Sequence, residues 1–164
     1  MKNLKIKIIR PISAPVMPKL FMPVLAVFFL AMCVSSPKFD GVMNRDWKLS
    51  EVLIGGTSIG FDRDKLADEG FGEIYTLRFD AERVNGIGAP NRYFAPYTLG
   101  DKNTITIKTM AGTLMASFRE PEALKENEYY KLLQNVKIWN LKNDSLRLYS
   151  NGDGTEEAVL IFTE

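Results

Sequence analysis

Few residues of this chain have side chains that could do chemistry. The 164-residue sequence has no histidine and one cysteine, Cys33. Without histidine the chain lacks Ser–His and Cys–His nucleophile pairs, the usual zinc ligands and the commonest general base near neutral pH. Two facing carboxylates could still hydrolyse a glycosidic bond, but sequence spacing singles out no such pair. We therefore expect no catalytic residue and no enzymatic activity, with a carboxylate-based enzyme as the last alternative.

Two short motifs resemble known ligand sites, but both are incomplete. Asp62 and Asp64, with Glu73 eleven residues after Asp62, have part of the spacing of a calcium loop. Such a loop needs an oxygen ligand at its fifth position and a glycine at its sixth, where this chain has Leu66 and Ala67. The glycines at 86 and 88 lack the third glycine of a dinucleotide-binding turn and suit a bend in a strand. We expect no metal and no cofactor.

Cys33 is instead the expected acceptor of a lipid. Residues 1–19 carry five basic and no acidic side chains, and an apolar run follows at 20–32. This is the design of a secretory signal, and the run is shorter than the roughly 20 residues of a membrane-spanning helix. The sequence Leu-Ala-Met-Cys that ends at Cys33 resembles a bacterial lipobox, although Met32 stands where that pattern prefers Gly, Ala or Ser. An uncleaved anchor or a buried thiol are the alternatives.

This signal predicts an exported protein of the cell envelope, anchored to a membrane by lipidated Cys33 and facing the periplasm or the cell surface. Residues 1–33 form the signal peptide, 34–44 a short tether and 45–164 the folded domain. Residues 34–164 carry 16 basic and 20 acidic side chains. A mildly acidic mature chain gives no electrostatic reason for nucleic-acid binding, and we expect none.

Hydrophobic periodicity predicts the elements that position these residues. Alternating apolar and polar residues predict strands at 47–52, 75–79, 83–88 and 104–108, with 112–118 as the antiparallel partner of the last. Charged residues at 61–70 indicate a loop with one helical turn. The segment 89–101 is rich in Pro, Tyr, Asn and Gly and is expected to be irregular. Both tryptophans, Trp47 and Trp139, are expected in the core.

The second half of the chain predicts one helix and three strands. Pro121 is expected to open the helix, whose apolar stripe is Tyr129, Leu132, Leu133 and Val136. A meander of strands at 136–141, 145–150 and 158–162 follows, joined by turns at 142–144 and 151–154. Strands, one helix and more strands predict an α+β fold with a mostly antiparallel sheet packed with one main helix.

An ordered set of motifs resembles the META (HslJ-like) domain family. Trp47-x-Leu49 resembles the opening W-x-L of that family. Residues 84–97 resemble its V-x-G-x-x-G-C-N-x-Y-x-G-x-Y segment, and 113–117 resemble T-x-M-A-C. The spacing of Glu126, Tyr129, Leu133 and Val136 resembles the E-x-x-F-x-x-x-L-x-x-V helix. Ala89 and Ser117 replace the two cysteines that the family often has, and Pro90 follows the first.

The resemblance covers nearly the whole mature domain. It implies a small, cracked antiparallel barrel with a helix, a cell-envelope setting and loose links to stress response. It implies no catalytic residue. We therefore expect a non-enzymatic envelope lipoprotein that binds an unknown envelope protein. The alternative is a binder of a small apolar ligand or lipid inside the barrel.

The best candidate for a contact surface is the aromatic segment at 93–97. Tyr93, Phe94 and Tyr97 lie close together there, and exposed aromatic side chains are typical anchors of interfaces. The alternative is that the rings close one end of the barrel from the inside.

Overall fold

The computed structural model describes residues 38–115, 120–151 and 157–164. The predicted signal peptide, Cys33 and residues 34–37 of the predicted tether lie outside these residues. So does most of the turn predicted at 151–154. The described residues form one compact unit. None of its described helices is long and apolar enough to cross a membrane.

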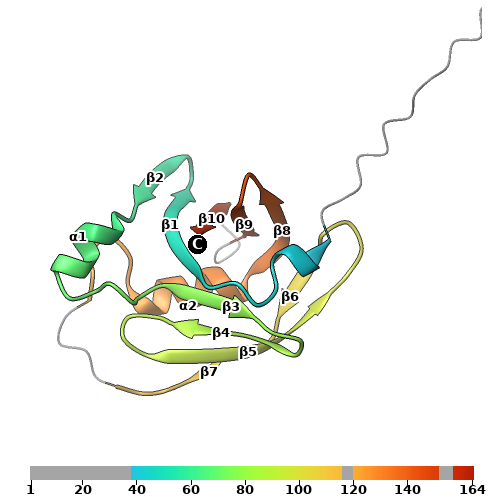
Figure 1. The fold of residues 1–164 in the computed structure, drawn as a ribbon, viewed down its shortest axis with the longest axis horizontal. Coiled ribbons are helices and arrows are strands. Elements are labelled where there is room, and N and C mark those ends of the chain that lie inside the picture. The colour runs from blue at the N-terminus through green and yellow to red at the C-terminus, as the bar shows by residue number, and fades with distance from the viewer. Residues whose placement is uncertain (1–37, 116–119, 152–156) are drawn as a thin grey trace, which may run out of the picture. The chain divides into compact units, whose positions relative to one another are not determined.

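The described residues form an antiparallel sheet with two α-helices, which confirms the predicted α+β class (Figure 1). A 3-10 turn at Phe39–Gly41 precedes the sheet, α1 spans Arg63–Asp68 and α2 spans Glu126–Gln134. The strands are β1 (Trp47–Ile54), β2 (Thr57–Gly60), β3 (Thr76–Phe79), β4 (Arg83–Ile87), β5 (Arg92–Leu99), β6 (Ile105–Ile107), β7 (Ala111–Gly112), β8 (Val136–Lys142), β9 (Ser145–Ser150) and β10 (Ala158–Thr163).

The sheet curls into a nearly closed barrel, as the family resemblance implied. Its strand order is β6-β5-β4-β3-β1-β10-β9-β8, with β2 added to β1 and β7 added to β5. The two end strands meet only at an isolated bridge between Thr104 and Ile138, beside which the Trp139 N–H donates to the Asn103 carbonyl at 3.0 Å. This joint between β6 and β8 is the unsealed seam of the barrel.

Aromatic rings pack densely in the interior of the barrel. Phe39 packs against Phe79, Tyr97 and Trp139, with ring centroids 5.0 to 5.6 Å apart. A second group of rings surrounds Tyr129 on α2. Trp47 and Trp139 are both buried, which confirms their predicted core positions. Burial of these rings is the main driving force of the fold.

Three sequence-based expectations about local structure were wrong. Residues 89–101 contain the regular strand β5, because Tyr93 and Ala95 alternate inward between exposed neighbours. Among the described residues of the predicted strand 112–118, only Gly112 belongs to a strand, and this strand, β7, pairs with Tyr93 and Phe94 rather than with 104–108. Helix α2 begins at Glu126 rather than at Pro121, because the Glu128 carboxylate accepts a hydrogen bond from the Lys125 N–H at 2.8 Å and ends the preceding turn there.

The folded domain also begins earlier than predicted. Phe39 and Val42 are buried in the core. The Val42 carbonyl accepts a hydrogen bond from the Trp47 indole at 2.9 Å. The last part of the segment expected as a tether, residues 39–44, is therefore part of the domain. The polar composition of this segment suggested a tether, but the segment contains two buried apolar side chains, Phe39 and Val42.

Candidate functional site

Of the three predicted contact residues, only Phe94 lies open on the surface. Successive side chains of a strand point to opposite faces, so Tyr93 is 2% exposed and Phe94 is 45% exposed. Tyr97 is half-buried, and its hydroxyl donates to the Asp80 carbonyl at 2.7 Å. For Tyr93 and Tyr97 the structure thus favours the alternative in which the rings fill the barrel.

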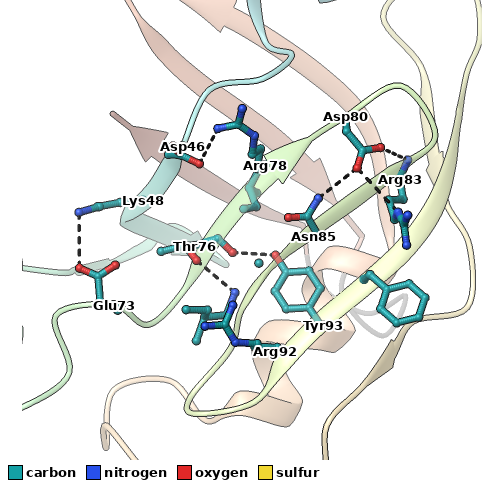
Figure 2. Close-up of a pocket in the computed structure, with 14 residues that line it drawn as sticks. Asp46, Lys48, Glu73, Thr76, Arg78, Asp80, Arg83, Asn85, Arg92 and Tyr93 are labelled. Carbon is teal, nitrogen blue, oxygen red and sulfur yellow. Dashed lines mark hydrogen bonds and ion pairs between the residues drawn. The ribbon is translucent and has the colours of Figure 1, made fainter.

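The exposed face around Phe94 contains a groove of about 500 Å³ over β3, β4 and β5. Strand register explains which side chains meet there: Arg78 lies opposite Asn85, Asn85 opposite Phe94, and Ile87 opposite Arg92. Figure 2 shows these charged and polar side chains around the groove. We call it the arginine groove. Its charged residues are Asp46, Lys48, Glu73, Arg78, Asp80, Arg83 and Arg92.

Three of the four cations in the arginine groove have carboxylate partners. Arg78 lies 3.0 Å from Asp46, Arg83 lies 3.7 Å from Asp80, and Lys48 lies 4.0 Å from Glu73. The Arg92 guanidinium has no ion-pair or hydrogen-bond partner within residues 38–115, 120–151 and 157–164. One positive charge of the groove is therefore left uncompensated.

Asp80 fixes the tight turn between β3 and β4 beside the groove. Its carboxylate accepts hydrogen bonds from the N–H groups of Glu82 at 2.9 Å and Arg83 at 2.8 Å. These bonds hold the pKa of Asp80 below its ordinary value. Arg83 also lies over the Phe94 ring, 5.8 Å from its centroid. The ionised Asp80 carboxylate thus fixes the turn that places Arg83 against the exposed Phe94 ring.

A second groove of about 430 Å³ shares Arg92, Glu73 and Ile87 with the first. Its remaining lining is mostly apolar, with Ile74, Pro90 and Met115 beside Gly70 and Thr113. Met115 is 54% exposed and Leu114 next to it is fully exposed. We call this the apolar groove. Arg92 is therefore placed where a charged and an apolar surface meet.

A buried carboxylate holds the backbone beneath Arg92. Glu126 at the start of α2 is 8% exposed. It accepts hydrogen bonds from the N–H groups of Ala89 at 2.6 Å and Asn91 at 2.7 Å, from the Asn91 side chain at 2.7 Å and from the Tyr130 hydroxyl at 3.1 Å. The Asn91 side-chain oxygen in turn accepts from Thr113 at 2.9 Å and from the Met115 N–H at 2.6 Å.

This network connects residues of three of the motifs that resemble the META family. It joins α2, the segment before β5 and the segment after β7, and so orients both walls of the apolar groove. From the sequence, Glu126 was only a motif position and Arg92 was not a predicted site residue. The period-two alternation of 92–95, with Arg92 and Phe94 on one face, was the signal that could have found Arg92.

The phenols inside the barrel form another polar network. The Thr76 carbonyl turns inward and accepts hydrogen bonds from Tyr93 at 2.8 Å and Tyr129 at 3.3 Å. The Tyr75 hydroxyl donates to the Leu124 carbonyl. Burial raises the pKa of Tyr75, Tyr93 and Tyr129 well above the ordinary value. These hydroxyls are thus neutral donors, and their chemistry is that of structural hydrogen bonds.

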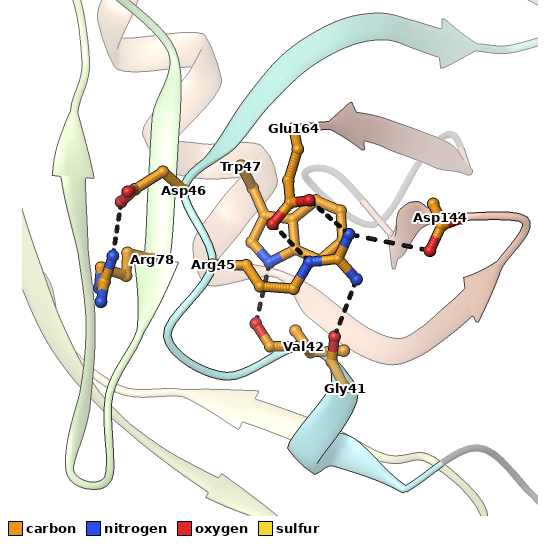
Figure 3. Close-up of polar contacts among 8 residues, drawn as sticks. All are labelled: Gly41, Val42, Arg45, Asp46, Trp47, Arg78, Asp144 and Glu164. Carbon is orange, nitrogen blue, oxygen red and sulfur yellow. Dashed lines mark hydrogen bonds and ion pairs between the residues drawn. The ribbon is translucent and has the colours of Figure 1, made fainter.

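Arg45 links the two ends of the described domain (Figure 3). Its guanidinium makes two hydrogen bonds to Glu164, at 2.6 and 2.7 Å, and one to the Gly41 carbonyl at 3.2 Å. It also stacks on Trp47, 4.5 Å from the ring centroid. The hydrogen bonds between Arg45 and Glu164 raise the pKa of Arg45 and lower that of Glu164. The cluster therefore connects Glu164 with Gly41 of the 3-10 turn.

The residues of the incomplete calcium motif have other roles. Asp62 caps α1 by accepting from the N–H groups of Asp64 and Lys65, both at 3.1 Å. Glu73 pairs with Lys48 in the arginine groove. In the described part of the chain, no group of three or more potential ligand residues is placed to hold a metal ion.

Comparison with known proteins gives a family and a fold. The sequence model of the META domain matches residues 40–163. A solved structure of a protein from Burkholderia xenovorans is similar, with a TM-score of 0.58 and 21% identity over 94% of this chain and 95% of that one. A DUF4847 family protein from Bacteroides vulgatus has a TM-score of 0.51 and 13% identity over 76% of this chain and 95% of that one. Comparison with curated proteins gave no match.

Proposed function

The chain belongs to the META domain family, and on that premise we propose that it is a non-enzymatic lipoprotein of the bacterial envelope whose domain binds another protein. The observation that carries the proposal is the distribution of aromatic and charged side chains. Aromatic rings are packed across the barrel interior, while Phe94 and the uncompensated Arg92 lie on the outer face of β5. Binding at the outer face needs no rearrangement of the core.

The apolar-ligand alternative receives less support. A barrel that encloses a ligand needs open space between its inward side chains. Here Phe39, Phe79 and Trp139 pack edge to face at 5.0 to 5.2 Å. The two grooves beside Arg92 instead lie on the outside, where a protein surface can reach them.

Membrane attachment completes the proposal. Lipidation of Cys33, expected from the lipobox-like signal, would hold the domain at a membrane and facing other envelope proteins. Mass spectrometry of the full chain from cells should find a lipidated N-terminal cysteine, and Cys33→Ser should release the protein from the membrane fraction. An unmodified Cys33 in membrane-bound protein would contradict this part of the proposal.

Photocrosslinking in cells tests the binding role. Phe94 of the full chain is replaced with benzoylphenylalanine, and Tyr149 is replaced in a matched control. Tyr149 is a similarly exposed aromatic residue on β9. We expect a discrete protein adduct from position 94 and a weaker or absent one from position 149. Equal labelling from both positions, or none from either, would contradict the proposed function.

A further inference from the structure

We infer that the arginine groove and the apolar groove together bind an extended segment of a partner protein that carries one carboxylate next to one apolar side chain. This inference rests on the proposed function and specifies the chemistry of the partner. It starts from Arg92, which lines both grooves. A carboxylate of the partner would pair with Arg92, and its apolar neighbour would lie against Ile74, Pro90 and Met115.

The charge balance of the groove selects a single carboxylate. Its other three cations already lie within 4.0 Å of carboxylates of the same chain. A polyanion such as a nucleic acid would therefore meet Asp46, Glu73 and Asp80 as well as the cations, and repulsion would offset the attraction. One carboxylate matches the one unpaired guanidinium, and the planar fork of arginine suits it.

The apolar groove adds the second element of recognition. Met115 and Pro90 lie at the surface beside an unpaired cation, and methionine adapts its shape to different side chains. Burying an aliphatic side chain there removes apolar area of both molecules from water. A segment with only the carboxylate would leave this apolar surface exposed to water. We therefore expect tight binding to need both the carboxylate and the apolar side chain.

The polar lining favours a peptide over an acyl chain. The Asn85 amide faces the arginine groove and has one long hydrogen bond, 3.4 Å to Asp80. A peptide backbone offers donors and acceptors to such an amide, whereas an acyl chain offers none and would desolvate it. Phe94 adds an exposed flat ring on the next outward position of β5.

Fluorescence anisotropy with the full chain carrying Cys33→Ser tests the inference. The probes are labelled, end-blocked Gly/Ser hexapeptides with a central Glu-Leu, Gln-Leu or Glu-Ser pair. We expect the Glu-Leu peptide to bind at least about threefold more tightly than either other peptide, as an ion pair at a partly desolvated surface allows. Arg92→Gln should remove the preference for Glu over Gln, and Arg92→Lys should retain part of it.

The matched control is Arg147→Gln, an exposed arginine on β9. This variant should leave the preference for Glu unchanged. In the protein with the unsubstituted groove, 500 mM NaCl should weaken the preference for Glu. Equal binding of the Glu and Gln peptides, or displacement by octanoate at lower concentration than by unlabelled peptide, would overturn the inference. If the crosslink from position 94 persists in either case, the proposed function stands and only the partner chemistry is wrong.

Discussion

Glu126 is the single residue on which the order of the site depends most. Its carboxylate accepts four hydrogen bonds from three residues. Glu126→Gln keeps the size of the side chain but places an amide N–H₂ against those donors. We expect the free energy of unfolding to fall by about 2–3 kcal/mol, because buried donors lose a charged acceptor. Urea unfolding measures this, and Glu122→Gln, at an exposed position, should change it little.

Gly86 occupies a position where any side chain would collide with the neighbouring strand. A Cβ at this position would lie 2.0 Å from the Thr76 carbonyl oxygen and 2.8 Å from the Tyr93 hydroxyl. Gly86→Ala should therefore displace the inward carbonyl and destabilise the domain by about 3 kcal/mol or more. Gly60→Ala on β2, where a Cβ meets nothing within 4 Å, is the control. Equal thermal midpoints for the two variants would contradict the close approach.

At the scale of elements, Arg63 on α1 stabilises the point where β1 changes partner. β1 pairs with β3 at Trp47 and Lys48 and with β2 from Glu51 onward. Between these pairings the Arg63 guanidinium donates to the Leu49 carbonyl at 2.5 Å and the Ile74 carbonyl at 2.8 Å. Burial lowers the pKa of Arg63 from its ordinary value.

Arg63→Met should therefore leave strand carbonyls without donors. We expect a loss of about 1–3 kcal/mol of unfolding free energy and faster amide hydrogen exchange in β2 and β3. Lys65→Met on the same helix, where the lysine is exposed and 4.0 Å from Glu69, serves as the control. Slow amide exchange in both variants would show that the change of β1 from β3 to β2 as partner does not depend on Arg63.

The contact between α2 and the sheet predicts how stability depends on alkaline pH. The pKa values of Tyr75, Tyr93 and Tyr129 are raised in the folded state by burial. A raised folded pKa means that the stability contribution is complete below the unfolded pKa of about 10 and is lost as pH rises above it. Each phenol should lower stability by about 1.4 kcal/mol per pH unit in that range.

Absorbance at 295 nm measures this titration. We expect these three tyrosines to ionise together and only when the domain unfolds, in one steep step that coincides with loss of the far-ultraviolet dichroism signal. Tyr93→Phe should reduce the amplitude of that step. Gradual ionisation near pH 10 in folded protein would contradict the buried phenol network.

At the scale of the whole molecule, the short segment before β1 completes the barrel. Phe39 packs between Phe79 and Trp139, and Val42 is fully buried. A fragment of residues 45–164 should therefore be less stable than one of 38–164 by at least about 3 kcal/mol, since it loses a buried phenylalanine and more. Thermal unfolding followed by circular dichroism compares the two fragments. Equal midpoints would indicate that residues 38–44 act only as a tether.

The sequence by itself determined the elements whose cause is local. Alternating residues specified β1, β3, β4 and β6, and the residues between β8 and β9 specified the hairpin that joins them, where Asn143 and Asp144 both adopt the left-handed conformation that such turns require. The ordered motifs specified the family. Each strand, turn and single motif can be read from residues close together in the chain, and the family follows from the order of the motifs.

Only the tertiary structure decided which side chains form the site. Arg92 is unusual because the three other cations near it pair with carboxylates just before β1, on the turn after β3 and on the segment before β3. Glu126 reaches Ala89 and Asn91 across 35 residues or more of chain. Tyr93 and Phe94 differ in exposure because one face of β5 lines the interior of the barrel. A short stretch of sequence does not show which face that is. Such contacts depend on how the strands are ordered around the barrel, and that order is a property of the whole fold.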